Sequence, residues 1–567
     1  LKRYQYAGAL MEFRDYDRFK NSAGQSTVRV NRSRQGYTYK TLSDGSYRPY
    51  VQVREQQTYE LEASACKEQL RCTPDILGKH TPLTAHRWEA LELDEWGRIT
   101  LSESRDQGEY YGQAPLSETQ VRVEYKDLPE PWVWGLVTLH EETNNVPLAD
   151  NETRTQRFGY DEKGRLTSAV REPGDADLEL VQRYGYDGFG NVNQIEMKAS
   201  QEQVWRQVHV DYDAEGLFVR QLHMPLGHRE TYSFDRGLGV VTRLRDVTGL
   251  TSYQVYDDFG RPMAGDQAVN GKILGSVVYT DYEKKALGQD DEGLGLWGLK
   301  LRTYGDELGT SQIETDRYGR PIYAVSETVF GKQIESFLGY DHRGRVKRVL
   351  LPKFSDGDLH GYSEYAYNAL DEVSKIKHPN NTQTHYYRDK LRQGVKDASG
   401  RWTIQEADRL GRIVRTKGPF TCPQDGIGCL VPGGDEQLIA TMRYQFGAFS
   451  HLRTIGQLGA DEKMPSIQIV TDKYGQRLQL QDTATGTRTS RYNAYGELIE
   501  DTDAEGNSKV YTYDLLGRMT QILHDQGVEK FFYDGQYKGL PDGSIRSVAP
   551  TDRRPRSKAM GFTRTLL

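Results

Sequence analysis

Aspartate, glycine and arginine recur at a fixed spacing in this sequence, most clearly in the string YDEKGRL, where they are Asp161, Gly164 and Arg165. Repeated carboxylates could hide a catalytic acid–base pair, and repeated guanidinium groups could form a ladder that binds a ligand. A structural role competes with both, because aspartate bonds the backbone two residues on and glycine adopts positive φ at little steric cost. We therefore expect Asp and Gly to build turns, with each Arg pairing with a turn carboxylate or a neighbouring carbonyl.

The same phrase returns along most of the chain. Copies that begin at Tyr160, Tyr186 and Tyr212 are 26 residues apart, further clear copies begin at Tyr256, Tyr340 and Tyr513, and looser copies lie between Leu93 and Tyr492. Self-similarity at a period of about 20–50 residues indicates a repeat architecture. The turn residues that we predict from the best copies are Asp161, Gly164, Arg165, Asp187, Gly190, Asp213, Gly216, Asp257, Gly260, Arg261, Asp341, Gly344, Arg345, Asp514, Gly517 and Arg518.

Each turn is flanked by stretches with the alternation of a β-strand. Residues 166–170 follow one turn in this way, and residues 509–513 alternate aromatic with polar side chains before another. Each copy therefore predicts a β-hairpin. A single hairpin is marginal in water, but a series of them can pair edge to edge. We expect an all-β fold, built as one long, curled sheet of hairpins.

Two other strings resemble ligand-binding motifs. The string GLGLWG at 293–298 has the spacing of a dinucleotide fingerprint, but acidic residues precede it and no helix pattern follows, so we expect a loop. The string DTDAEG at 501–506 resembles the start of a calcium loop, but Thr512 stands where an EF-hand needs glutamate, so we expect an ordinary turn. We predict no cofactor, no metal site and no catalytic residue: the chain is not expected to be an enzyme.

Four cysteines form two local pairs outside the repeats: Cys66 with Cys72, and Cys422 with Cys429. Five and six intervening residues do not match the usual zinc spacing. Local disulfides, free structural thiols and a four-cysteine metal site all remain open, and we expect local disulfides because secreted proteins permit them.

Composition excludes several classes of protein. The net charge is only −7, which gives no basic field for nucleic acid, and no apolar run reaches the roughly 20 residues of a membrane span. The apolar content is low, yet 37 tyrosines argue against disorder. A sheet that is wet on both faces, such as a hollow shell, needs few apolar side chains and accommodates tyrosine well.

The recurring phrase resembles the YD repeat of bacterial Rhs proteins, of the B and C components of Tc insecticidal toxin complexes, and of animal teneurins. The resemblance covers about residues 154–534, and the string RYQYAGALMEFRDYDR at 3–18 is similar to a segment of Tc B components. It implies a sheet that spirals around a cavity, sequesters a toxin polypeptide before delivery, and is secreted as part of a toxin or effector complex.

We divide the chain into an N-terminal β-rich segment (1–85), a transition with a first repeat-like hairpin (86–150), the repeat array (151–545) and a basic tail or linker (546–567). The sequence begins at Leu1 without an initiator methionine, so we expect a piece of a longer polypeptide.

The Rhs core that closes such shells, with its self-cleaving aspartate, has no counterpart here, so the resemblance favours a B-component-like chain. The implied partners are a C-component-like Rhs chain or core, an enclosed toxin, and a translocation pore or secretion spike. Two alternatives remain: the shell segment of a type VI or contact-dependent Rhs effector, and a cell-surface carbohydrate-binding or adhesion protein.

Overall fold

A computed structural model describes residues 10–20, 26–62, 64, 72, 77, 80, 82–107, 117–146, 151–269, 271–274, 277–289, 295–305, 309–357, 361–421, 441–458, 466–548 and 563–565. Across this part of the chain, 41 strands belong to one sheet.

The strands before the main array are long. They are β1 (Leu10–Lys20), β2 (Ser26–Thr41), β3 (Tyr47–Glu62), β4 (Thr84–Leu93), β5 (Ile99–Gln107), β6 (Ser117–Leu128) and β7 (Val133–Asn145).

Shorter strands follow, starting with the first clear repeats. They are β8 (Glu152–Tyr160), β9 (Leu166–Arg171), β10 (Leu180–Tyr186), β11 (Val192–Ala199), β12 (Arg206–Tyr212), β13 (Val219–Met224), β14 (His228–Asp235), β15 (Val240–Arg245), β16 (Leu250–Tyr256), β17 (Pro262–Val269), β18 (Lys272–Ile273), β19 (Val278–Gln289), β20 (Gly295–Tyr304), β21 (Ser311–Thr315), β22 (Pro321–Glu327), β23 (Gln333–Tyr340) and β24 (Val346–Phe354).

The remaining strands complete the sheet, and two short 3-10 turns, η3 (Pro225–Gly227) and η6 (Ala448–Ser450), lie in connecting loops. These strands are β25 (Ser363–Tyr367), β26 (Val373–Lys377), β27 (Gln383–Asp389), β28 (Arg392–Lys396), β29 (Arg401–Ala407), β30 (Ile413–Thr421), β31 (Thr441–Phe446), β32 (Leu452–Leu458), β33 (Ser466–Thr471), β34 (Arg477–Asp482), β35 (Gly486–Tyr492), β36 (Leu498–Thr502), β37 (Ser508–Tyr513), β38 (Met519–His524), β39 (Gly527–Tyr533), β40 (Pro541–Val548) and β41 (Thr563–Thr565).

The sheet is a continuous antiparallel meander. Strand after strand pairs with its neighbour in the sequence, as β8 does with β9 and β39 with β40, and β17 pairs with both β18 and β19. The pairing register shifts at the tyrosine of most repeats, for example between Gly185 and Tyr186 and between Thr512 and Tyr513. Such bulges increase the local twist of a sheet, so their repetition makes the ribbon curl.

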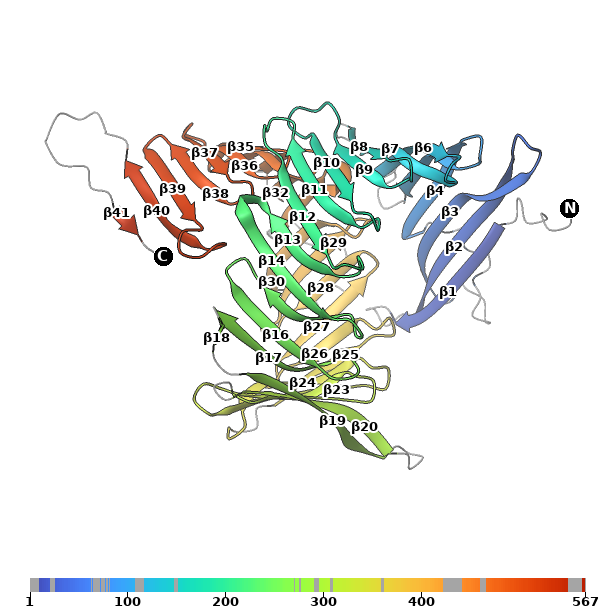
Figure 1. The fold of residues 1–567 in the computed structure, drawn as a ribbon. Helices are drawn as coiled ribbons and strands as arrows, with labels where there is room; N and C mark the ends of the chain where they lie inside the picture. The colour runs from blue at the N-terminus through green and yellow to red at the C-terminus, as the bar shows by residue number, and fades with distance from the viewer. Residues whose placement is uncertain are drawn as a thin grey trace, which may run out of the picture.

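The curled ribbon passes through the molecule and returns to its own beginning. Figure 1 shows the path from β8 to β11 at the top, through β19 and β20 at the bottom, and back to β32 and β35 beside the early repeats. The first and last described strands, β1 and β41, lie on opposite sides of the upper part.

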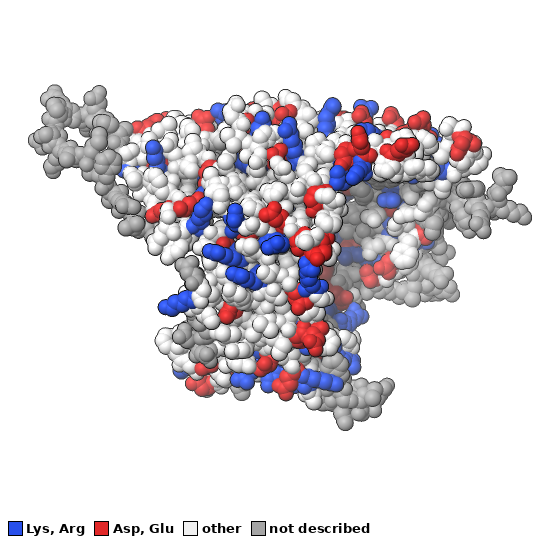
Figure 2. Space-filling view, in the orientation of Figure 1, with Lys and Arg blue, Asp and Glu red and all other residues white. Residues whose placement is uncertain are grey.

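Little of the chain is buried in a core. One buried cluster contains Val28 and Val30 of β2, Tyr59 and Leu61 of β3, and Cys72 and Leu77. The accessible surface is 35,883 Å², whereas a compact globule of this mass would expose about 20,000 Å². Most of the sheet therefore has solvent on both faces, and Figure 2 shows acidic and basic groups interspersed over the visible face.

The predicted all-β fold is confirmed, with one local correction. Gly295 and Gly298 lie in β20 and not in a loop, so the glycine-rich string belongs to a hairpin; Gly293 lies outside the described residues. The last repeat strand extends to Val548, past the predicted start of the tail at 546, and 563–565 of that tail form β41. The domain boundaries stay predictions. One sheet continues across residues 85 and 150.

Candidate functional site

The repeat turn is a compact device centred on aspartate. In the first clear copy, the N–H of Gly164 donates to the Asp161 carbonyl, and Asp161 Oδ1 accepts the N–H groups of Lys163 and Arg165. Gly164 has φ +78°, which aspartate-x-x-glycine turns of this kind require. The Arg165 side chain folds back, and its Nε donates to Asp161 Oδ2 over 2.8 Å.

Arginine and tyrosine then join each repeat to the next. Arg165 lies 4.4 Å from the ring centroid of Tyr186, and the Tyr186 hydroxyl donates to the Leu166 carbonyl over 2.7 Å. A guanidinium over an aromatic face is attractive, and the hydroxyl bond fixes the spacing of the rings. The same Arg-over-aromatic contact recurs at Arg98 and Tyr125, Arg261 and Tyr282, Arg320 and Tyr340, Arg345 and Tyr367, Arg412 and Phe446, and Arg518 and Tyr533.

The other predicted turn residues occupy equivalent places. Asp257, Asp341 and Asp514 bind their own arginines, Arg261, Arg345 and Arg518, and Gly190, Gly216, Gly260, Gly344 and Gly517 all have positive φ. Asn191 replaces arginine beside Asp187, and Asp213 binds Arg236 from a later turn. None of these residues converges with the others into one site: they are spread along the ribbon.

Several further turns of this kind escaped the sequence analysis. Asp246 and Asp397 each accept the N–H groups of the residues two and four positions on. The calcium-like string forms the ordinary turn that the sequence predicts, centred on Asp503, while Asp501 is 4% exposed and pairs with Arg488. The two carboxylates therefore have separate partners.

Cys72 is fully buried and disulfide-bonded. Cys66, Cys422 and Cys429 lie outside the described residues, so the predicted pairings remain predictions.

The alternating turns of the meander give the ribbon two margins. The margin with the repeat turns at 94–97, 161–164, 187–190, 213–216, 257–260 and 316–319 is here called the YD rim. The opposite margin, with the connections at 172–179, 200–205, 225–227 and 246–249, is the return rim. Where the ribbon overlaps itself, the YD rim of 447–539 lies on the return rim of 144–247, and the bonded residues are between 291 and 323 positions apart. We call this contact line the seam.

An aromatic ring between two guanidinium groups forms the first strong contact of the seam. Tyr474, the third residue of its turn, has Arg171 at 4.7 Å and Arg154 at 5.2 Å from its ring centroid. Arg154 also lies 3.6 Å from the Phe449 ring and donates to the Lys473 carbonyl over 2.8 Å. Arginines from the first revolution of the ribbon thus contact aromatic rings from the second revolution, about 300 residues later in the chain.

Glu172 lies beneath this contact and is 4% exposed. Its carboxylate accepts bonds from the Tyr474 hydroxyl and from Lys473 Nζ, both 2.6 Å, and from the N–H of Thr155 at 3.0 Å. Its φ is +51°, an unfavourable conformation for a residue other than glycine. Burial and the bond to Glu172 raise the pKa of Tyr474. Two of the three donors come from the second revolution, so Glu172 depends on the closed seam.

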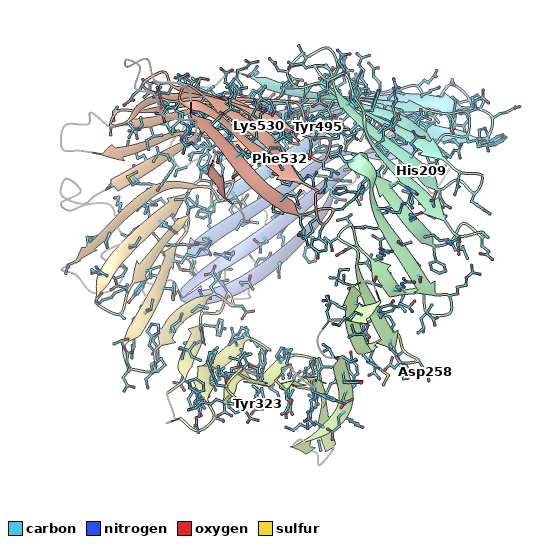
Figure 3. All side chains as sticks on the ribbon, turned by 60° about the vertical axis from the view of Figure 1, so that its left-hand side comes forward. His209, Asp258, Tyr323, Tyr495, Lys530 and Phe532 are labelled. Carbon is cyan, nitrogen blue, oxygen red and sulfur yellow. The ribbon has the colours of Figure 1, made fainter. Side chains whose placement is uncertain are left out.

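Tyr495 repeats this arrangement one hairpin later. Arg206 lies 3.6 Å from its ring centroid and forms two bonds, of 2.7 and 2.9 Å, with Glu497. The Tyr495 hydroxyl donates to the Met197 carbonyl over 3.1 Å and accepts the Ala199 N–H at 3.3 Å. Burial raises the pKa of Tyr495 to about 12. Figure 3 shows Tyr495 in the upper part of the molecule, where the late strands meet the early repeats.

A hydrogen bond further along the seam joins His228 Nε2 to Asp534 Oδ1 over 3.0 Å, with His228 only 5% exposed. Hydrogen bonds from Arg518 hold the pKa of Asp534 well below its ordinary value, and the N–H of Gly539 and the His228 side chain add to the effect.

Toward β2 and β3 the two revolutions line a cavity. A cavity of about 920 Å³ separates the ends of β2 and β3 from the turns after β25 and β27. Its lining includes Arg29 and Glu60 on one side and Leu370, Tyr387 and Arg388 on the other. The third residue of the turn at 368–371 is Leu370, and the Tyr387 ring also lines the cavity.

The seam residues were not predicted from the sequence. The turn aromatics and the strand-end arginines were visible separately, but no pattern connects residues roughly 300 positions apart without the curvature of the sheet. Among the described residues, no group of three or more histidine, cysteine, aspartate or glutamate side chains could hold a metal ion.

The comparisons with known proteins begin with the repeat itself. Residues 492–529, from the end of β35 into β39, match the family described as RHS Repeat. The chain contains an RHS repeat. A comparison with curated proteins finds no match.

Solved structures match the fold over most of the chain. The crystal structure of TcdB2-TccC3-Cdc42 has a TM-score of 0.69 at 11% identity, over 92% of this chain and 37% of that one. The crystal structure of TcdB2-TccC3 matches with a TM-score of 0.68 at 13% identity, over 92% of this chain and 35% of that one. The structure of the Photorhabdus luminescens Tc holotoxin pore matches with a TM-score of 0.67 at 11% identity, over 93% of this chain and 35% of that one. The chain shares the fold of the matched part of these chains and spans just over a third of their length.

No helix within the described residues is both long and apolar enough to cross a membrane.

Proposed function

We propose that this chain is a wall segment of a protein container, which keeps a toxin polypeptide separate from its surroundings until delivery. The role is containment and not catalysis. The seam carries the proposal: a ribbon bonded to itself one revolution later is a continuous wall, whereas a ribbon without such contacts would be an open strip.

Surface and charge support this role. The wall has far more accessible surface than a compact globule of its mass, as expected for one sheet with an inner and an outer face. The repeated carboxylates, such as Asp161 and Asp514, are occupied by turn N–H groups and arginine. They therefore stabilise the wall and are not available as a reactive pair.

The implied partner is a C-component-like chain that closes the container. The fold match is to TcdB2-TccC3 complexes, and this chain corresponds to only part of them. A shell segment of a secreted effector would have the same wall, so the two assignments differ in what is attached to it. Export as part of a toxin complex follows from the proposed role.

A particle envelope tests the proposal. Small-angle scattering or negative-stain microscopy of the chain is expected to show a curled wall around an open interior, wider than a compact particle of 64.7 kDa. A solid, compact particle would overturn containment.

A protection assay tests the cargo. An unstructured reporter fused behind the closing partner should resist protease when this chain is present. In a variant with Tyr474→Ala and Arg206→Ser, which weakens the seam, the reporter should be cleaved. Cleavage at the same rate with and without the wild-type chain would contradict the proposal.

A further inference from the structure

Three of the seven tryptophans lie in two neighbouring turns of the sheet. Trp96 is in the turn between β4 and β5, and Trp132 and Trp134 are on either side of the first residue of β7. The ring centroids of Trp96 and Trp134 are 5.3 Å apart and the ring planes are inclined by 62°, so the two indoles form a corner. Trp96, Trp132 and Trp134 are 38%, 79% and 49% exposed. We call these three residues the tryptophan corner.

Partly buried polar contacts hold the two turns in place. Arg98 donates to Asp94 and, through both terminal nitrogens, to Asp127. Asp127 also accepts the N–H of Gly135 over 2.8 Å, which ties β7 to the turn before β5. Arg48, from the hairpin before, donates to a backbone carbonyl of that turn over 2.9 Å. The corner is therefore pre-organised, and a ligand would lose little binding free energy in ordering it.

The backbone of Trp132 is strained. Its φ is +70°, a left-handed conformation that is unfavourable for a bulky residue. Burial does not offset this strain, because Trp132 is the most exposed tryptophan in the described part of the chain. Strained residues concentrate at ligand sites, where the surrounding structure holds them in place. The strain therefore favours a binding role for this ring over a structural one.

The tryptophan corner has no cation of its own. Two other tryptophans have one over the ring: Arg54 is 5.3 Å from the centroid of Trp88, and Arg183 is 4.4 Å from that of Trp205. Most repeat tyrosines have the repeat arginine in the same way. Within the described residues, no lysine or arginine lies over any of the three rings of the corner. These rings are thus exceptions in a sheet that is joined by cation–π contacts.

The charge of the two turns is negative. Residues 93–97 (LDEWG) and 128–135 (LPEPWVWG) contain no lysine or arginine, and both Glu95 and Glu130 are exposed. The face of an aromatic ring carries negative potential and attracts cations, and tryptophan does so most strongly. Exposed aromatic faces and carboxylates together therefore favour a cationic ligand.

We propose that the tryptophan corner binds a quaternary ammonium group, such as the trimethylammonium group of choline. Its methyl groups would lie against the faces of Trp96 and Trp134, and Glu95 and Glu130 would attract its charge. A lysine ammonium is strongly hydrated and keeps its water at an exposed site. A trimethylated group presents apolar methyl groups to the rings instead, so binding also buries apolar surface. The site is on the YD rim, and the proposal holds whether or not the wall encloses a polypeptide.

Two small molecules separate charge from shape. Choline and its uncharged carbon analogue, in which a tert-butyl group replaces trimethylammonium, have the same shape. Calorimetric or saturation-transfer NMR titration of the wild-type chain should show choline binding about three- to thirtyfold more tightly than the analogue. Equal affinity for the two molecules would overturn the proposal.

Substitutions locate the site. Trp96→Ala with Trp134→Ala should abolish choline binding, and Glu95→Gln with Glu130→Gln should weaken it without changing the affinity for the analogue. The matched control is Trp205→Ala, which should leave choline binding unchanged because a guanidinium already lies over that ring. Choline binding that survives the loss of both corner rings would refute the site.

Trp132→Gly distinguishes a binding role from a structural one. Glycine adopts φ +70° at little cost, so this variant should melt at a higher temperature than wild type and bind choline more weakly. Opposite signs for stability and binding are not expected of a residue that serves the fold. A lower melting temperature with unchanged choline binding would overturn the place of Trp132 in the site.

Vesicles identify the source of the head group. Co-sedimentation of the wild-type chain with phosphatidylcholine vesicles, competed by free choline, would show that the group is recognised on a lipid. Choline binding without co-sedimentation would show that a soluble choline compound is recognised. Both results support the site, whereas the absence of both choline binding and co-sedimentation would overturn it.

Discussion

The guanidinium of Arg206 lies 3.6 Å from the ring centroid of Tyr495, although the two residues belong to successive revolutions of the sheet. The contact is typical of the seam, where cation–π pairs and ion pairs replace a hydrophobic core. Such pairs are directional, so they fix how one revolution is placed on the other, and few substitutes preserve them.

Removing the Arg206 guanidinium should open the seam locally. Arg206→Met leaves the partly buried Glu497 carboxylate without its arginine partner. We expect a loss of about 2–3 kcal/mol in local stability. Hydrogen exchange of the Ala199 amide, which bonds to Tyr495, measures it. The control is Arg491→Met, whose pair with Glu500 is exposed and should contribute under about 1 kcal/mol. Equal effects of the two changes would contradict the role of the seam.

The tyrosine hydroxyl of the repeat should contribute to stability on its own. Tyr513→Phe keeps the ring but removes the bond to the Leu498 carbonyl, at 2.8 Å, and should destabilise by about 0.5–1.5 kcal/mol. Thermal unfolding measures the change. Tyr253→Phe, at an exposed ring, serves as the control and should alter the midpoint little. An unchanged midpoint for Tyr513→Phe would show that the ring alone joins the repeats.

Two glycines in one turn should respond in opposite ways to alanine. Gly190 has φ +93°, so Gly190→Ala should cost about 1–2 kcal/mol through backbone strain. Gly188 has no positive φ, and a Cβ there would meet open space, so Gly188→Ala should be neutral or slightly stabilising. Denaturant unfolding of the two variants distinguishes them, and equal losses would mean that the turn conformation is not what constrains Gly190.

The turn aspartates should make stability depend on acid. Partial desolvation raises the pKa of Asp341, but hydrogen bonds from the Arg345 side chain and from turn N–H groups outweigh it and lower the pKa to about 2. A lowered pKa in the folded state stabilises the protein above the unfolded value, near 3.8, and this contribution is lost as pH falls from there toward 2.

Asp341→Asn should therefore lower the melting temperature at pH 7 and flatten its decline between about pH 4 and pH 2. Melting temperatures across this range test the prediction. A pH profile parallel to that of wild type would show that Asp341 does not carry this dependence.

The sequence was sufficient to predict the local structure of the repeats. The hairpins, the turn at Asp161 and the role of Gly164 follow from interactions within five residues, and these decide the strand pairs. Curvature follows less directly, because it results from bulges repeated at Tyr186, Tyr513 and their equivalents.

The seam lay beyond prediction for a geometric reason. Whether Tyr474 meets Arg154 or a neighbouring residue depends on the summed twist of all the hairpins between them, and a small error in each would move the contact by a strand. Gly295 and Gly298 were misjudged because the charges before them resemble a loop, whereas both residues pair with β19.

The seam also restricts the insertion and deletion of repeats during evolution. Each seam pair joins hairpins a fixed count apart, so gaining or losing one repeat between Arg206 and Tyr495 would bring every later turn opposite the wrong partner. A repeat added in that interval must therefore be matched by a loss elsewhere in it, whereas substitutions within the strands face no such constraint. Copy number between β12 and β35 should vary much less among relatives than the amino-acid sequence does.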